Sequence, residues 1–306
     1  MKDMHLALRL PNWLGDVIMT LPTLEALSTS GFSFELFGKP WVKDLLSAYS
    51  YPIHTLPNTF LQARRIYQAQ KITHCILLPN SLSSALHLAF SPTQSIGYRS
   101  NGRQWLLNQS LEKKPGLHEV EYFWTLAQFA VKKTLVRPKN PKLQIADHYL
   151  ESAALLLKQQ HLDNDFLLIC PGAIGAGVHH SSKIWPHWQM LVKMLLKEGN
   201  TLVACPAPFE LEAFQKKFGH DIHILDNVNL PLYAAIMQRA KRVIANDSGP
   251  MHLAAAVQAP VLGIFGQTNP QRSRPWGGEF MGDLNHWPNC EEVLNWIRNN
   301  ATPPHE

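Results

Sequence analysis

The chain has 306 residues, of which 45% are hydrophobic and 17% are charged, and its formal net charge is +5. This length is ample for two domains, and no run approaches the roughly 18 apolar residues of a membrane-spanning helix, so the composition predicts a folded, water-soluble protein. The positive charge favours anionic partners without distinguishing nucleic acid, phosphorylated lipid and nucleotide diphosphate.

The amino terminus runs directly into an apolar segment and lacks the regions of a signal peptide, so we expect no export. Three of the four cysteines lie inside apolar runs, where a free thiol behaves as a small hydrophobe. The cysteines are Cys75, Cys170, Cys205 and Cys290. We therefore expect a reduced, cytoplasmic protein.

Short apolar segments alternate with segments of helical period along the chain, which is typical of βαβ units in an α/β protein. In the first half we expect strands at 5–10, 33–38, 74–79 and 94–98, and helices at 17–27, 59–71 and 81–90. The same alternation restarts after Arg137, with strands at 166–170, 201–205, 222–225, 242–245 and 261–265 and helices between them.

A polar segment with two prolines separates the halves. Because proline resists both helix and strand, we place a linker at 138–147, between a first domain at 1–137 and a second at 148–306. Parallel α/β sheets bind ligands at the carboxyl ends of their strands, so two such domains facing each other across a cleft would each hold one substrate. Functional motifs should therefore follow strands.

The first motif is the loop 9–16, which leaves the first strand and enters a helix with Gly15 and Asp16. One interpretation makes Asp16 a helix-capping carboxylate, which satisfies free amides and suits the helix dipole. The other makes it a general base, placed by Gly15, which lets the backbone pass close to a ligand. The motif alone favours capping.

The second motif, 243–256, is a strand that runs into a helix of small residues through Asp247, Ser248, Gly249, Pro250, Met251 and His252. Backbone amides at such a helix start, together with the helix dipole, form a site for an anion such as a diphosphate, and Pro250 is compatible with a first helical turn. The alternative is an ordinary capped helix with a packed His252. The composition of the run favours the anion site.

The third motif joins Gly172 and Ala173, after a strand, to Lys183 across a loop that contains two glycines. A lysine there can neutralise phosphate, although such a lysine is more often simply solvated. His179 and His180 lie in the loop without an accompanying metal-binding element, so we expect no metal and no cofactor. Neither a serine-hydrolase elbow nor a dinucleotide-binding glycine motif is present.

Taken together, these segments resemble the lipopolysaccharide heptosyltransferases of glycosyltransferase family nine, over most of the chain. The stretch 78–86, followed by 97–99 and 106–108, resembles the heptosyltransferase II branch. The resemblance implies a GT-B fold of two Rossmann-like parallel-sheet domains. It further implies an inverting transfer of heptose from ADP-heptose to the inner core of lipopolysaccharide, on a lipid A-Kdo-heptose type of acceptor.

The resemblance also implies roles for individual residues. Asp16 becomes the catalytic base. The donor-binding residues become Gly172, Ala173, Lys183, Glu210, Val228, Asp247, Ser248, Gly249, Pro250, Met251 and His252, with Glu210 near the ribose and Val228 against adenine. The acceptor-binding residues become Asn12, Gly15, Asn80, Ser81 and Arg99.

Two segments depart from the family pattern: the loop 174–182 is longer than expected, and the stretch 276–290 is shorter. Two alternatives therefore stay open. One is a family-nine transferase for another nucleotide sugar or surface glycan, and the other is a non-catalytic protein that binds a nucleotide or polyanion. Nucleic acid is disfavoured because the chain has no concentrated basic stripe with interleaved aromatic residues.

The implied acceptor is embedded in a bilayer, so we expect peripheral, reversible contact with the inner membrane surface. Basic residues of the first half are the candidates for this contact. They are Lys113, Lys114, Lys132, Lys133, Arg99 and Arg103.

Overall fold

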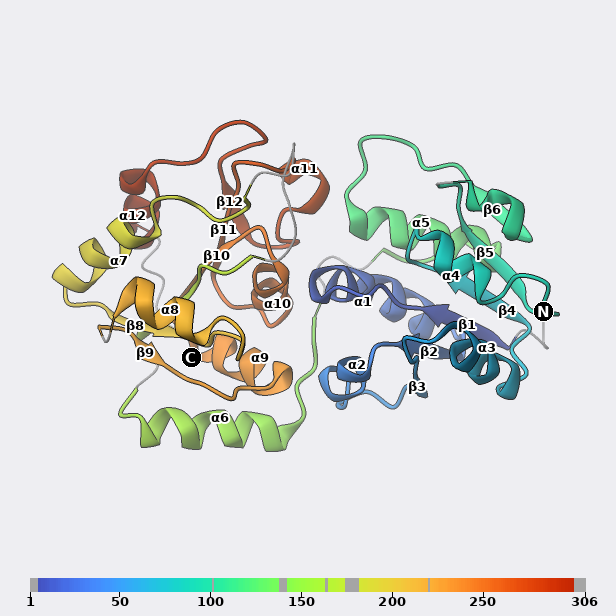
Figure 1. Cartoon of the computed structure of the whole chain (residues 1–306), viewed down its shortest axis with the longest axis horizontal. Coiled ribbons are helices and arrows are strands. Elements are labelled where there is room, and N and C mark those ends of the chain that lie inside the picture. Colours follow the sequence, from blue (N-terminus) through green and yellow to red (C-terminus); the bar gives the residue numbers. More distant parts are fainter. Residues whose placement is uncertain are drawn as a thin grey trace. The chain divides into compact units, whose positions relative to one another are not determined.

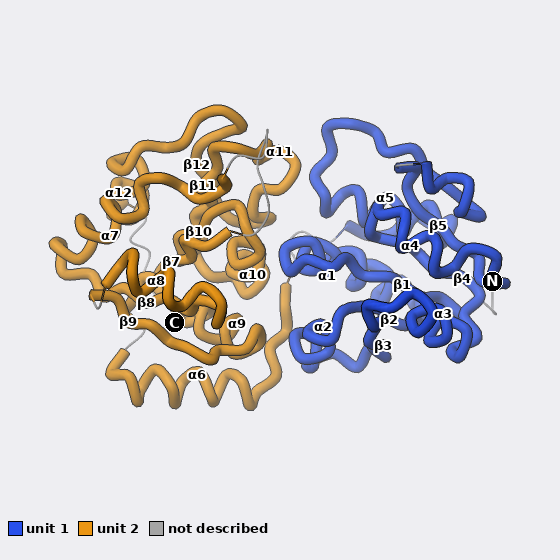
Figure 2. Tube along the Cα trace, in the orientation of Figure 1, with its two compact units in different colours: residues 1–141 blue, residues 142–306 orange. Residues whose placement is uncertain are grey.

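The computed structural model describes residues 5–100, 102–137, 142–162, 165–173, 182–219 and 221–299. The chain divides into two compact units, Met1–Pro141 and Lys142–Glu306 (Figure 2). The division falls inside the segment 138–147 that we assigned as linker, and the last residue of that segment, Asp147, is already the first residue of helix α6 (Asp147–Gln159).

Unit 1 is a six-stranded, all-parallel sheet with helices between its strands (Figure 1). Its strands are β1 (Leu6–Arg9), β2 (Phe34–Gly38), β3 (Ile53–Thr55), β4 (His74–Leu77), β5 (Gln94–Tyr98) and β6 (Gln109–Leu111). Its helices are α1 (Leu14–Thr29), α2 (Pro40–Leu45), α3 (Phe60–Ala69), α4 (Leu82–Leu86), the 3-10 helix η1 (Arg103–Leu106) and α5 (Glu119–Val131). The strand order β3-β2-β1-β4-β5-β6 places the point where the chain reverses direction across the sheet between β1 and β4.

The two faces of this sheet are covered by different helices. Helices α3 and α4 pack on one face, where Tyr67 of α3 and Ala85 of α4 belong to a core cluster that also includes Phe37 and Cys75. Since crossovers between parallel strands are right-handed, α1 lies on the opposite face, where it packs against α5.

Unit 2 repeats this architecture with a second six-stranded parallel sheet. Its strands are β7 (Phe166–Cys170), β8 (Thr201–Ala204), β9 (His223–Ile224), β10 (Arg242–Asn246), β11 (Val261–Ile264) and β12 (Glu279–Met281). Besides α6, its helices are α7 (Trp188–Lys197), α8 (Leu211–Phe218), α9 (Leu230–Arg239), α10 (Gly249–Ala256), α11 (Pro270–Ser273) and α12 (Cys290–Asn299). The order β12-β11-β10-β7-β8-β9 places the reversal between β7 and β10.

All the strands predicted from apolar runs are present. They could be predicted because the central strands are buried on both faces and their sequences are therefore apolar. The sequence prediction missed β3, β6 and β12, which are short and only partly buried. It also extended α4 too far, since the helix ends at Leu86 and residues 87–90 form turns. Conversely, α1 begins at Leu14, three residues before the predicted start.

Candidate functional site

The strongest sequence motif lies at the carboxyl end of β10, beside the reversal point of the sheet in unit 2, where open α/β sheets bind ligands. Asp247 follows the strand, and its Oδ2 atom lies 2.7 Å from Nζ of Lys183. The same oxygen accepts a hydrogen bond from the Thr268 hydroxyl at 2.7 Å. The fold thus brings the second and third motifs together, and it places a cation at the start of α10.

Asn246, the last residue of β10, holds the surrounding loops in place. Its side-chain oxygen accepts hydrogen bonds from the Trp185 amide and the Trp188 indole, and its amide nitrogen donates to the Pro171 carbonyl. All of these groups are buried, so this single side chain connects β10, the end of β7 and the segment that carries Lys183. Sequence analysis assigned Asn246 no role, because a lone asparagine after an apolar strand does not reveal its partners.

The start of α10 offers fewer backbone donors than we predicted. Of the four residues 248–251, Pro250 has no N–H, and the amide of Met251 donates to the Ser248 carbonyl. The amides of Ser248 and Gly249 precede the first helical hydrogen bond, so no helix carbonyl accepts from them. These two amides are the backbone donors that the turn leaves for the predicted anion.

Side chains further along α10 face the core of unit 2. Met251 is fully buried. A Cβ atom added to Gly263 would lie 2.5 Å from the Met251 sulfur, so the methionine side chain fills the space that this glycine leaves. His252 is also buried. Both residues were predicted to bind the donor, and their role in donor binding stays a prediction.

Two other predicted donor residues meet at the carboxyl end of β7. A Cβ atom on Gly172 would lie 2.4 Å from Oε1 of Glu210, so the glycine makes room for this carboxylate. Glu210 Oε2 accepts a hydrogen bond from the Ala207 amide. Ala173 follows Gly172, whereas most of the long loop of the third motif, 174–181, lies outside the described residues.

Val228 is partly buried and follows β9, next to Asn229, which caps α9. The proposed place of Val228 against adenine rests on the resemblance.

In unit 1, Asp16 is partly buried and lies in the first turn of α1, at the carboxyl end of β1 and the reversal point of the sheet. The N-cap residue is Trp13, so Asp16 occupies the third helical position and not the capping position that we considered. Arg9, which sequence analysis overlooked, shapes the loop before it: this buried guanidinium donates to the Leu10 carbonyl and to Asn12 Oδ1. Burial lowers the pKa of Arg9 from its usual value.

The other predicted acceptor residues follow β4 and β5. Ser81 caps α4, and its side chain accepts a hydrogen bond from the Ser84 amide. Asn80 accepts a hydrogen bond from Arg103, which also donates to the carbonyls of Tyr98 and Pro79. Arg99 is exposed, and its Nε atom donates to the Ser110 hydroxyl.

Arg103 cannot take part in the membrane contact that we predicted, because it is fully buried beneath this loop and burial lowers its pKa to about 10. Lys113 is also engaged, since its Nζ atom lies 3.1 Å from Glu119 and over the ring of Tyr122. The predicted basic docking surface therefore needs revision.

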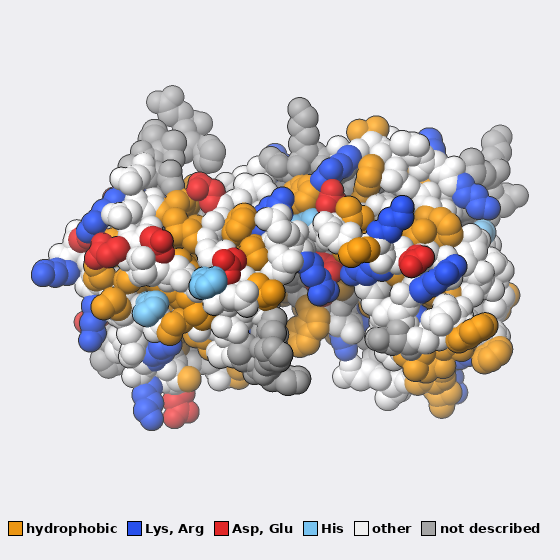
Figure 3. Space-filling model, turned by 90° about the horizontal axis from the view of Figure 1, so that it is seen from above, with side chains coloured by type: hydrophobic (Ala, Val, Ile, Leu, Met, Phe, Trp, Pro, Cys, Tyr) orange, Lys and Arg blue, Asp and Glu red, His pale blue; other side chains and the backbone are white. Residues whose placement is uncertain are grey.

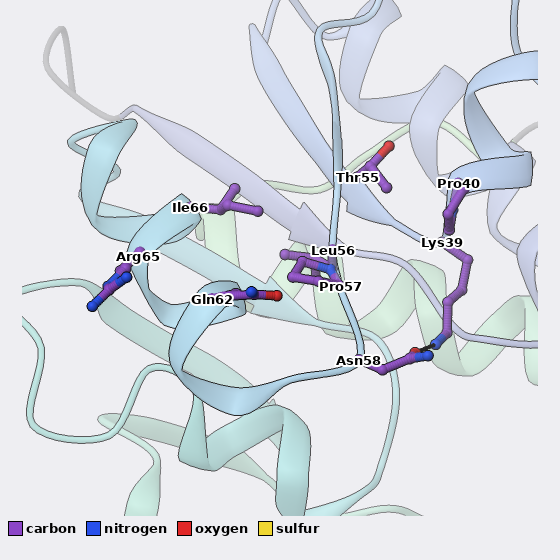
Figure 4. A pocket seen from close by; sticks show the side chains of 9 residues that line it. All are labelled: Lys39, Pro40, Thr55, Leu56, Pro57, Asn58, Gln62, Arg65 and Ile66. Carbon is purple, nitrogen blue, oxygen red and sulfur yellow. Dashed lines mark hydrogen bonds between the residues drawn. The ribbon is translucent and has the colours of Figure 1, made fainter.

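A groove of about 700 Å³ opens at the carboxyl ends of β2 and β3 (Figure 4). Two cations line it on opposite sides, Lys39 and Arg65, and Lys39 Nζ lies 2.6 Å from Asn58 Oδ1. The remaining lining residues are Pro40, Thr55, Leu56, Pro57, Gln62 and Ile66. Sequence analysis missed the groove, although Lys39 and Leu56 each follow a strand directly.

The sequence profile of glycosyltransferase family 9 (heptosyltransferase) matches residues 62–293. The chain belongs to glycosyltransferase family 9. Membership in family 9 confirms the predicted resemblance and makes the protein a glycosyltransferase.

Relatives in family 9 cover most of the chain. It is 26% identical to lipopolysaccharide heptosyltransferase 2 of Salmonella typhimurium, over 87% of this chain and 83% of the relative. It is 25% identical to lipooligosaccharide heptosyltransferase 2 of Haemophilus influenzae, over 87% and 84%.

Solved structures have the same fold. The ADP-heptose LPS heptosyltransferase II of E. coli superposes with a TM-score of 0.78 at 21% identity, covering 97% of this chain and 98% of that one. An E. coli heptosyltransferase solved with ADP gives a TM-score of 0.75 at 20% identity, covering 97% and 100%. The predicted GT-B class, with two Rossmann-like parallel-sheet domains, is confirmed.

The described part of the chain contains no helix that is both long and apolar enough to cross a membrane. Within the same residues, no three His, Cys, Asp or Glu side chains are grouped so that they could hold a metal ion.

Proposed function

We propose that this family 9 enzyme transfers a heptose from ADP-heptose to the inner core of lipopolysaccharide, with inversion at the anomeric carbon. The observation that carries the proposal is the contact between Lys183 and Asp247 at the start of α10. This contact positions the Lys183 cation, and the turn adds the backbone amides of Ser248 and Gly249. Together these groups can bind a diphosphate leaving group. The relatives named heptosyltransferase 2 support the choice of donor and acceptor.

In the proposed reaction, the Asp16 carboxylate accepts the proton of an acceptor hydroxyl while that oxygen attacks the anomeric carbon of the heptose. The bond from this carbon to the diphosphate oxygen breaks, and ADP leaves with an additional negative charge. Lys183 and the amides of Ser248 and Gly249 stabilise that charge. Gly172, Ala173, Glu210 and Val228 are proposed to position the remainder of the donor.

The acceptor is proposed to bind unit 1 through Asn12, Gly15, Asn80, Ser81 and Arg99. Lys39 and Arg65 of the groove add cations that match a phosphorylated, acidic glycolipid. We propose that the enzyme works in the cytoplasm at the periphery of the inner membrane, where such an acceptor is available.

The test is a transfer assay that combines a panel of nucleotide sugars with soluble, truncated core oligosaccharides. We expect mass spectrometry to show the addition of one heptose with ADP-heptose and a heptosylated inner-core acceptor. Faster transfer from another nucleotide sugar would replace the donor assignment. Tight binding of ADP without transfer to any acceptor would instead support a non-catalytic nucleotide-binding protein.

A further inference from the structure

Large hydrophobic side chains are exposed together on one part of unit 1, and Figure 3 shows hydrophobic side chains gathering in this unit, at the right of the view. We define the apolar patch as Phe60, Leu61, Leu82, Leu86, Phe90 and Trp105. Phe90 is 95% exposed and Trp105 is 87% exposed. Single apolar side chains are common on protein surfaces, whereas clusters of them are rare. An exposed apolar cluster therefore indicates a surface that binds a partner.

Contacts between three neighbouring elements hold the patch together. The Phe60 ring at the start of α3 lies 5.4 Å from the His87 ring after α4. Arg64 of α3 donates to the Ala89 and Phe90 carbonyls, and α4 packs against η1, which carries Trp105. The residues of the patch thus lie on adjoining elements: α3, α4 with the turn that follows it, and η1.

The backbone at Phe90 argues that its side chain has a role beyond folding. Phe90 has a φ of +58°, in the left-handed region that glycine and asparagine adopt most readily. An aromatic ring at such a position is strained, and at 95% exposure it gains little from packing within the chain. Strain retained at an exposed aromatic residue points to a partner that covers it.

The charge around the patch indicates what this partner is. Residues 1–141 hold 15 of the 28 lysines and arginines and 8 of the 23 acidic residues, a formal charge of +7, whereas residues 142–306 hold 13 and 15, a charge of −2. All positions from 45 to 111 lack aspartate and glutamate, and this stretch contains the whole patch. Arg65, Lys71 and Arg99 of this stretch are exposed. The stretch of chain that carries the patch therefore combines exposed apolar side chains with positive charge and has no carboxylate.

We propose that the apolar patch docks on an anionic lipid bilayer, with its aromatic and leucine side chains inserted among the headgroups and the neighbouring basic residues attracted to lipid phosphate. Aromatic rings flanked by arginine and lysine are the side chains that the membrane interface favours. Helix α3 carries both Phe60 and Leu61 of the patch and Arg65 of the groove, so docking brings the groove close to the lipid surface. The choice of a lipid partner rests on the proposed acceptor, a glycolipid.

The first test measures binding of the full chain to vesicles by sedimentation. We expect binding to vesicles that contain phosphatidylglycerol and much weaker binding to neutral phosphatidylcholine vesicles. The double substitution Phe90→Asn with Trp105→Ser should lower the partition coefficient on anionic vesicles by about tenfold or more. Asparagine suits the backbone at position 90, so we expect an unchanged circular dichroism spectrum and melting temperature.

The matched control removes two exposed hydrophobic side chains from unit 2, by Leu155→Ser with Met190→Ser. It should bind vesicles like the native chain. The proposal is wrong if the patch variant keeps native binding or if the control loses as much. It is also wrong if the native chain forms a dimer that only the patch variant abolishes, because a second copy would then cover the patch.

A second readout separates this proposal from the proposed function. The patch variant should transfer heptose to a soluble core oligosaccharide at the native rate. With the same acceptor in vesicles, its rate should be at most about one tenth of the native rate. Equal rates on vesicles for native chain and variant would contradict docking. If neither protein transfers heptose to either acceptor, the proposed function fails, and the vesicle-binding experiment still decides whether the patch binds lipid.

Discussion

Lys183 and Asp247 form an ion pair of 2.7 Å, and both side chains are largely shielded from water, with exposed fractions of 16% and 7%. The pair joins the segment after the long loop to the turn that starts α10. Asp247 holds the lysine in place before any anion binds. Because an ammonium group has three donors, Lys183 can keep this contact and still donate to a phosphate oxygen.

Replacing Lys183 by alanine should weaken ADP binding by about 1.5–3 kcal/mol, the range of a charge-assisted hydrogen bond. Isothermal titration calorimetry measures this change. The matched control is Lys241→Ala, because Lys241 of the same unit pairs with Asp165 at an exposed position. Unchanged ADP affinity in the Lys183 variant would show that the donor site has been misplaced.

Replacing Asp16 by asparagine should lower kcat by about 10²–10⁴, because asparagine cannot accept the proton. ADP affinity should stay native, and stability should fall by no more than about 0.3–1 kcal/mol, the effect of a first-turn carboxylate on the helix dipole. Asp147→Asn is the control, since Asp147 lies in the first turn of α6. A large loss of stability together with near-native turnover would make Asp16 a structural residue.

Replacing Asn246 by alanine should lower the free energy of unfolding by about 2–5 kcal/mol, because buried groups of Trp185, Trp188 and Pro171 lose their partner. It should also weaken ADP binding, since Lys183 lies two residues before Trp185. Urea unfolding and calorimetry measure both effects. Asn289→Ala, which removes the acceptor of the Glu292 amide, should leave ADP affinity native. Native ADP affinity in the Asn246 variant would mean that Lys183 is positioned without Asn246.

Stability should fall as the pH rises above about 9, in part through Cys75. Burial raises the pKa of this thiol to about 12, far above the value of an unfolded chain, so the unfolded state loses its proton first. The stabilisation is fully present below the unfolded pKa and is lost as the pH rises toward the folded one, at about 1.4 kcal/mol per pH unit.

The variant Cys75→Ala removes this titration, so its free energy of unfolding should decline less steeply between pH 9 and 11 than that of the native chain. Urea titrations at pH 8, 9, 10 and 11 measure the slopes. Ile76→Val, a truncation on the same strand without a titratable group, should shift the whole curve and keep the native slope. Parallel curves for the Cys75 variant and the native chain would contradict the prediction.

Much of the fold was predictable because the central strands of both sheets are buried on two faces and therefore appear as continuous apolar runs. The edge strands β3, β6 and β12 escaped prediction for the same reason, whereas the edge strand β9 was predicted. Strands β3 and β12 have few neighbours, so their sequences need not be apolar. The start of the helix after β4 was predicted to within one residue, whereas its early end at Leu86 was not predicted.

The candidate site was predictable to the extent that local motifs follow strands. Asp16, Lys183 and Asp247 were selected in this way. Asn246 and the groove between Lys39 and Arg65 were missed, because they depend on partners from distant parts of the sequence. The hydrogen-bond partners of Arg9 are local, but its burial follows from the strands β2 and β4 on either side of β1, which the local sequence does not reveal. The opposite error occurred at Arg103, which was interpreted as a surface cation and is buried beneath the loop after β4.

The sequence by itself determined the alternation of strands and helices, the division into two halves and the positions of the motifs, since these follow from hydrophobic period and from the short-range chemistry of turns. Only the tertiary structure decided which side chains meet. The order of strands in unit 2 places β7 beside β10, and this adjacency brings Lys183 to Asp247 across 64 positions of sequence. Exposure was decided at the same level, because packing buries Arg103 and leaves Phe90 and Trp105 in solvent. Neither property is encoded by the residue type alone.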